Sequence, residues 1–354
     1  TSRLLYLFQP QPSGFHPFGG LLQHNGTYYG VAEGGLHDDG IVFALVSGTS
    51  GTRIFETLYN FSGAPNDGEE PTGLVYIGAD GTLYGTTRMG GNGTACLFTD
   101  NGCGTMFELK PPATSFGMWH ESILHSFKGI PDGAGPGSGV VRENGSFYGT
   151  TEFGGTSGLC PAVIGCGTIY KITPLGSSAT ERVIHSFYTK RTSTDGVWVS
   201  DTLIAGGDGN LYGATSFGGG APACQVEPEV NGCGTFYSLT VGRGEKPRVK
   251  TLYSFAGGRD GEEPAALVGA ASSGVYGHTG YGGLSAACFD GCGTIFHMTH
   301  SGSTWNETRL HVFAGPDGEH PIGSLVLDGS TLYGTAGSGG TAACFCGTLF
   351  ELHT

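Results

Sequence analysis

Acidic turns are the first feature of this sequence that could carry chemistry. Five turns that lead from one repeat into the next contain an Asp-Gly step, and in three of them this step is followed by further carboxylates and a proline. The carboxylates of these three turns are Asp67, Glu69, Glu70, Asp260, Glu262, Glu263, Asp317 and Glu319. Glycine supplies a positive φ and proline sets the entry to a strand, so the pattern is first of all typical of a turn. If the turns gather on one face, the same carboxylates could bind Ca²⁺ or a hydroxyl-rich or cationic ligand, and both interpretations stay open.

Carboxylates could also act in catalysis. Two carboxyl groups at the right separation are enough to cleave a glycosidic bond, but a sequence does not give that separation. The chain has no Gly-x-Ser-x-Gly elbow, no His-Glu-x-x-His, no phosphate loop and no dinucleotide-binding turn. Its repeated segments are nearly equivalent, whereas catalysis usually needs one asymmetric group of residues. We therefore expect no catalytic residue and keep a carbohydrate-active enzyme as an alternative.

The histidines do not predict a metal site. Residues 37–39 read His-Asp-Asp, but three consecutive side chains on a loop rarely converge on one ion. His125, His185 and His311 occupy equivalent places in separate repeats, too far apart to share a metal. We expect them to be half-buried side chains with a polar tip. No cofactor is expected, apart from the Ca²⁺ that the acidic turns could hold.

Ten cysteines fall into five local pairs. The pairs are Cys96/Cys103, Cys160/Cys166, Cys224/Cys233, Cys288/Cys292 and Cys344/Cys346. An even count with local pairing indicates disulfides formed in an oxidising compartment. The spacing differs from pair to pair and the pairs lie far apart, which argues against zinc. The last pair flanks a single residue, so a bridge there would close a tight ring with poor geometry.

Five Asn-x-Ser/Thr triplets point to the same compartment. They begin at Asn25, Asn60, Asn92, Asn144 and Asn306. Such triplets are N-glycosylation acceptors in a secreted protein, but they also arise as plain turns in a chain rich in these residues. Asn60 lies within an apparent strand, where a glycan needs the outward face. We predict glycans on at least two of the other four.

A tandem repeat must position all of these residues. A Tyr-Gly step is followed six times by a Gly-rich loop and then by Gly-(Thr/Ile)-x-(Phe/Tyr), and the glycine of the step recurs at intervals of 55, 64, 64, 64 and 57 residues. In the second repeat, four segments have strand character: 74–76, 82–87, 105–109 and 123–127. Four strands in a meander are the content of one propeller blade. The sequence thus predicts an all-β, six-bladed β-propeller forming a single domain over residues 1–354.

The two ends of the chain predict how the propeller closes. Residues 4–8 (Leu-Leu-Tyr-Leu-Phe) match the fourth strand of the other repeats, and residues 349–352 match the third. The last blade therefore lacks an outer strand while the N-terminus has one to spare. Pairing the two would remove an exposed sheet edge.

The repeat resembles the bacterial GloVer tandem-repeat proteins. The resemblance covers nearly the whole chain and rests on four motifs of the second repeat. These are Thr72-Gly73-Leu74-Val75, Leu83-Tyr84-Gly85-Thr86-Thr87, Gly90-Gly91 and Gly104-Thr105-Met106-Phe107-Glu108-Leu109. The resemblance implies an extracellular or cell-surface repeat protein and brings no reaction or catalytic residue with it. The cysteine pairs and the sequons are additions to the family pattern.

Composition narrows the function classes. Gly accounts for 68 of 354 residues and charged residues for 13%, which excludes a helical protein. A net charge of -14 with only 16 Lys and Arg argues against nucleic acid as a partner. No apolar run approaches the ~20 residues needed to span a bilayer, and no signal segment opens the chain, so we expect a mature, soluble extracellular product.

Three functions remain open at this point. A secreted structural protein that assembles into a surface layer or fibre is the first, with copies of itself as partners. A glycan- or Ca²⁺-binding extracellular module is the second, and a carbohydrate-active enzyme is the third.

Overall fold

A computed structural model describes most of the chain. The described residues are 5–8, 13–48, 52–96, 101–114, 117–156, 159–160, 164–176, 178–190, 194–199, 203–227, 230–242, 246–341 and 346–354. Strands account for nearly all of the regular structure, and a single turn of 3-10 helix, η2 (Gly258–Asp260), is the only helix named among these residues. In the part of the chain so described, no helix is long and apolar enough to cross a membrane.

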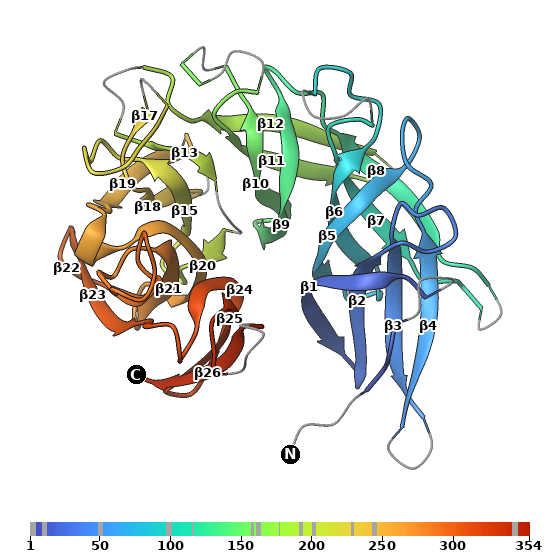
Figure 1. Ribbon diagram of the computed structural model, residues 1–354. Helices are drawn as coiled ribbons and strands as arrows, with labels where there is room; N and C mark the ends of the chain where they lie inside the picture. Colours follow the sequence, from blue (N-terminus) through green and yellow to red (C-terminus); the bar gives the residue numbers. More distant parts are fainter. Residues whose placement is uncertain are drawn as a thin grey trace. The chain divides into compact units, whose positions relative to one another are not determined.

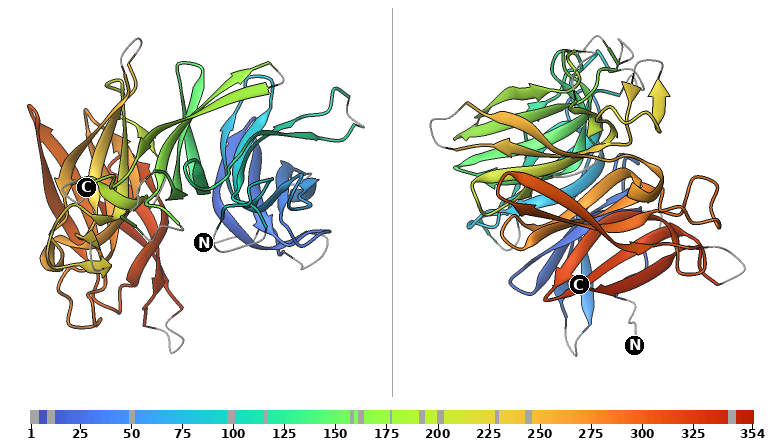
Figure 2. Two further views of the ribbon diagram at one scale, coloured as in Figure 1. Left: turned by 90° about the horizontal axis from the view of Figure 1, so that it is seen from above. Right: turned by 90° about the vertical axis from the view of Figure 1, so that its left-hand side faces the viewer.

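Each of the six repeats folds into its own antiparallel sheet (Figures 1 and 2). The first sheet contains β1 (Phe15–His24), β2 (Thr27–Glu33), β3 (Ile41–Ser47) and β4 (Arg53–Asn60). The second contains β5 (Gly68–Ile77), β6 (Leu83–Gly90), β7 (Thr105–Lys110) and β8 (His120–Ser126). The third contains β9 (Gly133–Glu143), β10 (Ser146–Gly154), β11 (Thr168–Leu175) and β12 (Ser178–Ser186). In these three sheets, strands adjacent in sequence are adjacent in space, which is the predicted meander.

The other three sheets vary this plan. The fourth contains β13 (Gly196–Val199), β14 (Ile204–Ala205), β15 (Asn210–Gly218), β18 (Thr235–Thr240) and β19 (Arg248–Ser254). The hairpin of β16 (Gln225–Glu227) and β17 (Val230–Asn231) lies apart from it, in the loop before β18. The fifth contains β20 (Glu262–Ala270), β21 (Gly274–Tyr281), β22 (Thr294–Ser301) and β23 (Thr304–Val312). The sixth contains β24 (Glu319–Asp328), β25 (Thr331–Ser338) and β26 (Thr348–His353). The chain is thus a six-bladed β-propeller, as predicted.

The recurring Tyr-Gly step has a packing reason. In every sheet, the glycine of this step lies beneath an aromatic ring of the third strand. A Cβ added to Gly85 would lie 2.5 Å from Cζ of Phe107, and a Cβ at the equivalent glycine of any other repeat would lie 2.3 to 2.6 Å from such a ring. The ring therefore packs directly on bare backbone. This contact explains why the Tyr-Gly step and the later Phe or Tyr recur together in the sequence.

A backbone hydrogen bond joins each repeat to the one before it. Three residues after the Asp of each acidic turn, the chain adopts a positive φ, for example 52° at Glu70 and 58° at Glu263. The N–H of this residue donates to a carbonyl of the preceding repeat: Glu70 to Asp39 over 3.0 Å and Glu263 to Cys233 over 3.1 Å. Gly135, Trp198 and His320 repeat the arrangement. The acidic turns are therefore part of the junction between successive sheets.

Packing divides the chain into two compact units. The first comprises residues 1–155 and 169–183, and the second comprises residues 156–168 and 184–354. In the first unit, Phe107 and Phe127 belong to the buried aromatic core, and Phe236 and Phe296 do so in the second.

The N-terminal segment packs on the first sheet without forming a strand. Leu5–Phe8 form no strand, and the last sheet has only the three strands β24–β26 among the described residues. The ring of Tyr6 stacks on Phe55 with centroids 4.2 Å apart, and Phe8 lies 5.3 Å from Phe43, much as Phe61 lies 5.1 Å from Phe107 in the next repeat. These rings contact side chains of both β3 and β4, so the segment lies on the face of the first sheet. An outer strand of a preceding sheet would pack on this face in the same way, so closure of the propeller by this segment stays a prediction.

Candidate functional site

The aspartates of the acidic turns are occupied by local hydrogen bonds. Oδ2 of Asp67 accepts from the hydroxyl of Tyr59 over 2.9 Å and from the N–H and hydroxyl of Ser62 over 2.9 and 3.0 Å. Asp67 is only 4% exposed, so this carboxylate is enclosed in its own turn. Asp260 is held in the same way by Tyr253 over 2.7 Å. The turn interpretation explains both residues.

The predicted histidines fill the place of Tyr59 in other repeats. Nε2 of His125 lies 3.1 Å from Oδ2 of Asp132, and the corresponding distances are 2.9 Å for His185 to Asp195 and 2.8 Å for His311 to Asp317. These imidazoles are partly buried and contact the carboxylate with their tips, as expected. The side chain of Asp317 is 43% exposed, more than those of Asp132 and Asp195.

The turn glutamates are half-exposed, and at least three of them have a hydrogen-bond or ion-pair partner. Glu69 accepts from Nδ2 of Asn101 over 3.2 Å, and Glu262 accepts from the N–H of Gly258 over 3.2 Å. Glu70 lies 4.0 Å from Arg88. Burial raises the pKa of both Glu69 and Glu263. Glu319 lies beside the cysteines 288 and 292, whose thiols are joined in a disulfide and therefore do not offer thiolate ligands. A Ca²⁺ site at these turns stays a prediction.

Three glutamates that we did not predict approach the turn aspartates from the following repeat. Glu121, Glu181 and Glu307 each lie four residues before the fourth-strand His or Tyr of their own repeat, and one oxygen of each is buried without a hydrogen-bond partner. Burial, with Asp67 next in effect, raises the pKa of Glu121 to about 8. Burial and the nearest aspartate likewise raise the pKa of Glu181 and of Glu307 to about 7.

One of these clusters has the donor set of a metal site. His125, Asp132 and Glu181 bring their ligand atoms within 4.8 Å of one another. In the two related clusters, however, a tyrosine takes the place of His125 beside the same Asp and Glu pair. The element shared by the three clusters is the pair of one Asp and one Glu, in which burial and the charge of the aspartate raise the pKa of the glutamate and favour its protonated form.

Four of the five predicted disulfides are present. Bridges join Cys96 to Cys103, Cys160 to Cys166, Cys224 to Cys233 and Cys288 to Cys292. Cys346 is also disulfide-bonded, whereas Cys344 lies outside the described residues. Disulfides form and persist in oxidising compartments, so the bridges fit an extracellular protein.

The sequons differ in their surroundings. The side chains at Asn25, Asn92, Asn144 and Asn306 are exposed, the first three in or beside turns and the last on β23. Asn60 is half-buried, and its Oδ1 accepts from the N–H of Leu36 over 3.0 Å, so this side chain has a structural role. Glycans on the four exposed asparagines stay a prediction.

Two tryptophans build equivalent grooves between successive repeats. Trp119 and Trp305 each lie six residues before the fourth-strand histidine of their repeat. Each ring reaches back to the tyrosine of a Tyr-Gly step in the preceding repeat: Trp119 lies 6.4 Å from Tyr29, and Trp305 lies 5.4 Å from Tyr212. A leucine just before the fourth-strand tyrosine, Leu58 or Leu252, lines the groove in both cases.

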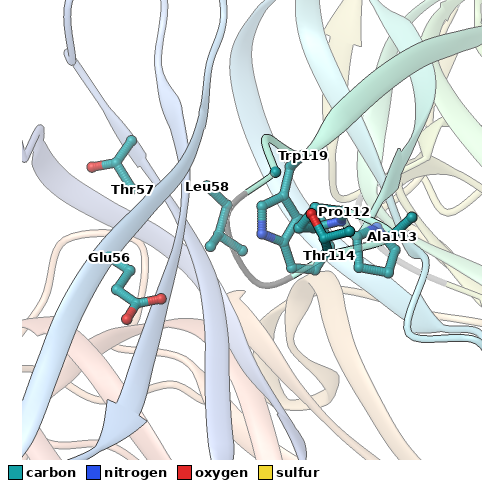
Figure 3. Close-up of a pocket in the computed structure, with 9 residues that line it drawn as sticks. Glu56, Thr57, Leu58, Pro112, Ala113, Thr114 and Trp119 are labelled. Carbon is teal, nitrogen blue, oxygen red and sulfur yellow. The ribbon is translucent and has the colours of Figure 1, made fainter.

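The groove around Trp119 has a volume of about 720 Å³ (Figure 3). Glu56, Thr57 and Leu58 of β4 form one wall, and the Pro-rich segment 111–114 forms the other with Trp119. Figure 3 shows Trp119 beside Pro112 and across from Leu58. We call this the Trp119 groove.

The groove around Trp305 has a volume of about 520 Å³ and a more polar lining. Its residues are Asp208, Asn210, Tyr212, Ser238, Thr240, Arg248, Val249, Lys250, Leu252, His300, Gly302, Ser303 and Trp305. Asp208 accepts from Nδ2 of Asn210 and from the hydroxyl of Tyr212, over 2.9 and 2.8 Å, and Thr240 donates to Oδ1 of Asn210 over 2.9 Å. This network holds the polar groups in fixed positions beside an aromatic ring. We call it the Trp305 groove.

Both grooves combine an aromatic surface with hydrogen-bonding side chains. That pairing suits a sugar, because the C–H face of a pyranose packs on an aromatic ring while its hydroxyls bond to amides, hydroxyls and carboxylates. None of the eight carboxylates that we singled out from the sequence lies in either groove.

Comparison with family models gives one match. The model of the Gloeobacter/Verrucomicrobia repeat matches residues 1–158 and again residues 93–226. The chain belongs to this repeat family. The resemblance noted in the sequence is thereby confirmed. No curated protein is similar enough in sequence to count as a relative.

Solved structures similar to this member of the repeat family share its fold at low identity. Hydrazine synthase of Kuenenia stuttgartiensis aligns with a TM-score of 0.51 and 13% identity, over 93% of this chain and 80% of that one. A putative oxidoreductase (glucose dehydrogenase) of Thermus thermophilus aligns with a TM-score of 0.49 and 14% identity, over 96% and 98%. A Hadza microbial sialidase aligns with a TM-score of 0.48 and 13% identity, over 97% and 66%. At such identities the likeness concerns the fold alone.

The tryptophans of this repeat-family protein could have been found in its sequence. The chain has only three tryptophans, and two of them fall at the same position of the repeat. Glu121, Glu181 and Glu307 share a repeat position in the same way. Aligning the repeats on the fourth-strand His or Tyr, rather than on the Tyr-Gly step, gives both signals.

Proposed function

We propose that this protein is an extracellular glycan-binding module that holds sugars in its two tryptophan grooves. The supporting observation is that the same kind of groove occurs twice, around a tryptophan at the same position of the repeat. Other repeats have no aromatic residue at this position. The equivalent position is Arg53 in the first repeat and Ala179 in the third. A packing role common to all repeats does not account for an aromatic ring at only two of them.

The test is binding to immobilised glycans, followed by titration calorimetry with the best binder. Trp305→Ala and Trp119→Ala should each remove one class of site, with a loss of about tenfold or more in affinity, as is typical for truncating a central aromatic contact. Trp305→Phe should retain part of the affinity. Phe289→Ala is the matched control, because this ring is fully exposed and lies outside both grooves. Unchanged binding by both tryptophan variants would contradict the proposal.

Assembly of a secreted protein into an extracellular layer or fibre is a second candidate, favoured by the disulfides and by the low share of charged residues, 13%. Light scattering on the purified protein should then detect larger species as the concentration rises. A monomer at all concentrations would exclude assembly.

A further inference from the structure

We propose that the Trp305 groove selects an anionic sugar, one carrying a carboxylate or a sulfate, and that the Trp119 groove does not. This inference rests on the proposed glycan-binding function and names the ligand class for one of its two sites. It depends on the charges along one wall of the groove.

Two cations without acidic partners form that wall. Arg248 and Lys250 alternate along β19, so their side chains project from the same face of the strand. Both are exposed, and neither forms an ion pair with any residue in the described part of the chain. The whole chain has 16 Lys and Arg against 30 Asp and Glu. Two unneutralised cations on one groove therefore run against the overall charge and give this groove a local affinity for anions.

Asp208, the acid of the same groove, is already engaged. Burial acts to raise its pKa, but hydrogen bonds from Asn210 and Tyr212 outweigh burial, so the pKa of Asp208 lies below its usual value. Its oxygens accept from the N–H and Nδ2 of Asn210 and from the hydroxyl of Tyr212. Asp208 is thus a fixed carboxylate that repels a second anion at its own end and accepts from sugar hydroxyls there. The anionic group of a ligand is directed to the β19 wall.

The chemistry of the two cations fits this assignment. A guanidinium donates two parallel hydrogen bonds to a carboxylate or a sulfate, and an ammonium adds a point charge. Trp305 offers the apolar surface on which the ring of the same sugar packs, and His300, which also lines the groove, lies at a centroid distance of 4.8 Å from it. One monosaccharide could therefore contact the ring, the polar network and a cation together.

The Trp119 groove supplies an internal comparison. Arg248 and Lys250 lie five and three residues before Tyr253, and the residues five and three before Tyr59 are Ile54 and Glu56. At the position where the Trp305 groove has Lys250, the Trp119 groove therefore has Glu56. Glu56 lines the Trp119 groove and is exposed, so this groove repels an anionic sugar.

The test uses three probes on the intact protein: a tetragalacturonate, its carboxyl-reduced neutral counterpart, and a heparin-derived tetrasaccharide. Calorimetry should show that at least one acidic probe binds about tenfold more tightly than the neutral one, as for a charge-assisted contact. Arg248→Gln and Lys250→Gln should each remove most of that preference, and Lys128→Gln, the same change at an exposed cation outside both grooves, should leave it intact. Raising NaCl from about 20 to about 500 mM should weaken acidic binding only, because salt screens exposed charges.

The outcomes separate the inference from the function on which it rests. Tighter binding of the galacturonate identifies a carboxylated ligand, and tighter binding of the heparin fragment identifies a sulfated one; either supports the inference if Arg248→Gln weakens it. Equal binding of acidic and neutral probes, lost in Trp305→Ala, overturns the inference and leaves glycan binding standing. Failure of all three probes and of the glycan array overturns both.

Discussion

At the scale of single residues, glycines at close contacts give the repeat its regularity. Gly85 lies where a Cβ would come within 2.5 Å of Phe107 and 2.8 Å of the Gly73 carbonyl oxygen. A Cβ added to Gly20 of β1 would have no atom within 4 Å. The two glycines therefore differ in packing alone, since neither adopts a positive φ.

We expect Gly85→Ala to destabilise the protein by about 1–3 kcal/mol, the usual cost of overpacking a core. Gly20→Ala should change the free energy of unfolding by only a few tenths of a kcal/mol. Urea unfolding followed by circular dichroism measures both. Equal stability of the two variants would show that the ring contact does not require glycine.

A second residue-scale prediction concerns pH. The pKa of Glu121 is about 8 in the folded protein and 4.5 in the absence of its surroundings, because burial and then the charges of Asp67 and Glu108 disfavour its ionised form. A raised folded pKa means that stability is fully present below pH 4.5 and is lost as the pH rises towards 8. The ionisable groups that act on it or are acted on by it are Asp67, Glu108 and Tyr59.

We therefore expect Glu121→Gln, which keeps the shape but cannot ionise, to match the wild type at about pH 5 and to melt at a higher temperature at about pH 8. Calorimetric melting at both pH values, compared with the exposed Glu56→Gln, isolates the effect. A constant difference between Glu121→Gln and wild type at the two pH values would refute the shifted pKa.

At the scale of structural elements, disulfides fix the loops between the second and third strands of the sheets. The bridge Cys224–Cys233, with its Cα atoms 5.1 Å apart, encloses the hairpin β16–β17. Val230 of this hairpin is fully buried. The loop is therefore both covalently closed and packed, and it leads directly into β18.

Replacing both cysteines of this bridge by serine should lower the free energy of unfolding by roughly 2–3 kcal/mol, as loop-closure entropy predicts for so short a ring. Chemical denaturation measures this loss. Dithiothreitol should lower the stability of the double variant by less than it lowers that of the wild type, because the variant has no bridge to reduce at this loop. A variant as stable as the wild type would mean that packing of the hairpin alone orders the loop.

At the scale of the whole molecule, the N-terminal segment contributes packing to the first sheet. Tyr6 and Phe8 lie on Phe55 and Phe43, as an outer strand of a preceding repeat would. Leu7, between them, is 65% exposed. The segment therefore stabilises the first sheet through alternate side chains.

We expect the double variant Tyr6→Ala, Phe8→Ala to lower the free energy of unfolding by about 1–3 kcal/mol, since both rings are only partly buried and full burial of one ring contributes roughly 1.5–3 kcal/mol. Deleting residues 1–10 should have at least the same effect, and Leu7→Ala is the matched control. Thermal melting compares the four proteins. If the deletion melts like the full chain, the segment has no stabilising role.

The sequence alone determined the number of repeats, the strands within them and the local disulfides, because each depends on residues close together in the chain. Alternation of apolar residues, Gly-rich turns and paired cysteines act over a few residues, so a single repeat contains their signal. The strand predicted at 105–109 accordingly falls within β7, and the one predicted at 123–127 overlaps β8.

Only the tertiary structure decided which side chains meet across successive repeats. Asp67 belongs to an acidic turn in the sequence, but in the structure it is buried and accepts hydrogen bonds from Tyr59 of β4 and from Ser62. Trp305 meets Tyr212 from ninety-three positions away, a distance over which no local pattern operates. The carboxyl pairs and the two grooves each combine residues of two successive repeats, so the pattern within one repeat does not reveal them.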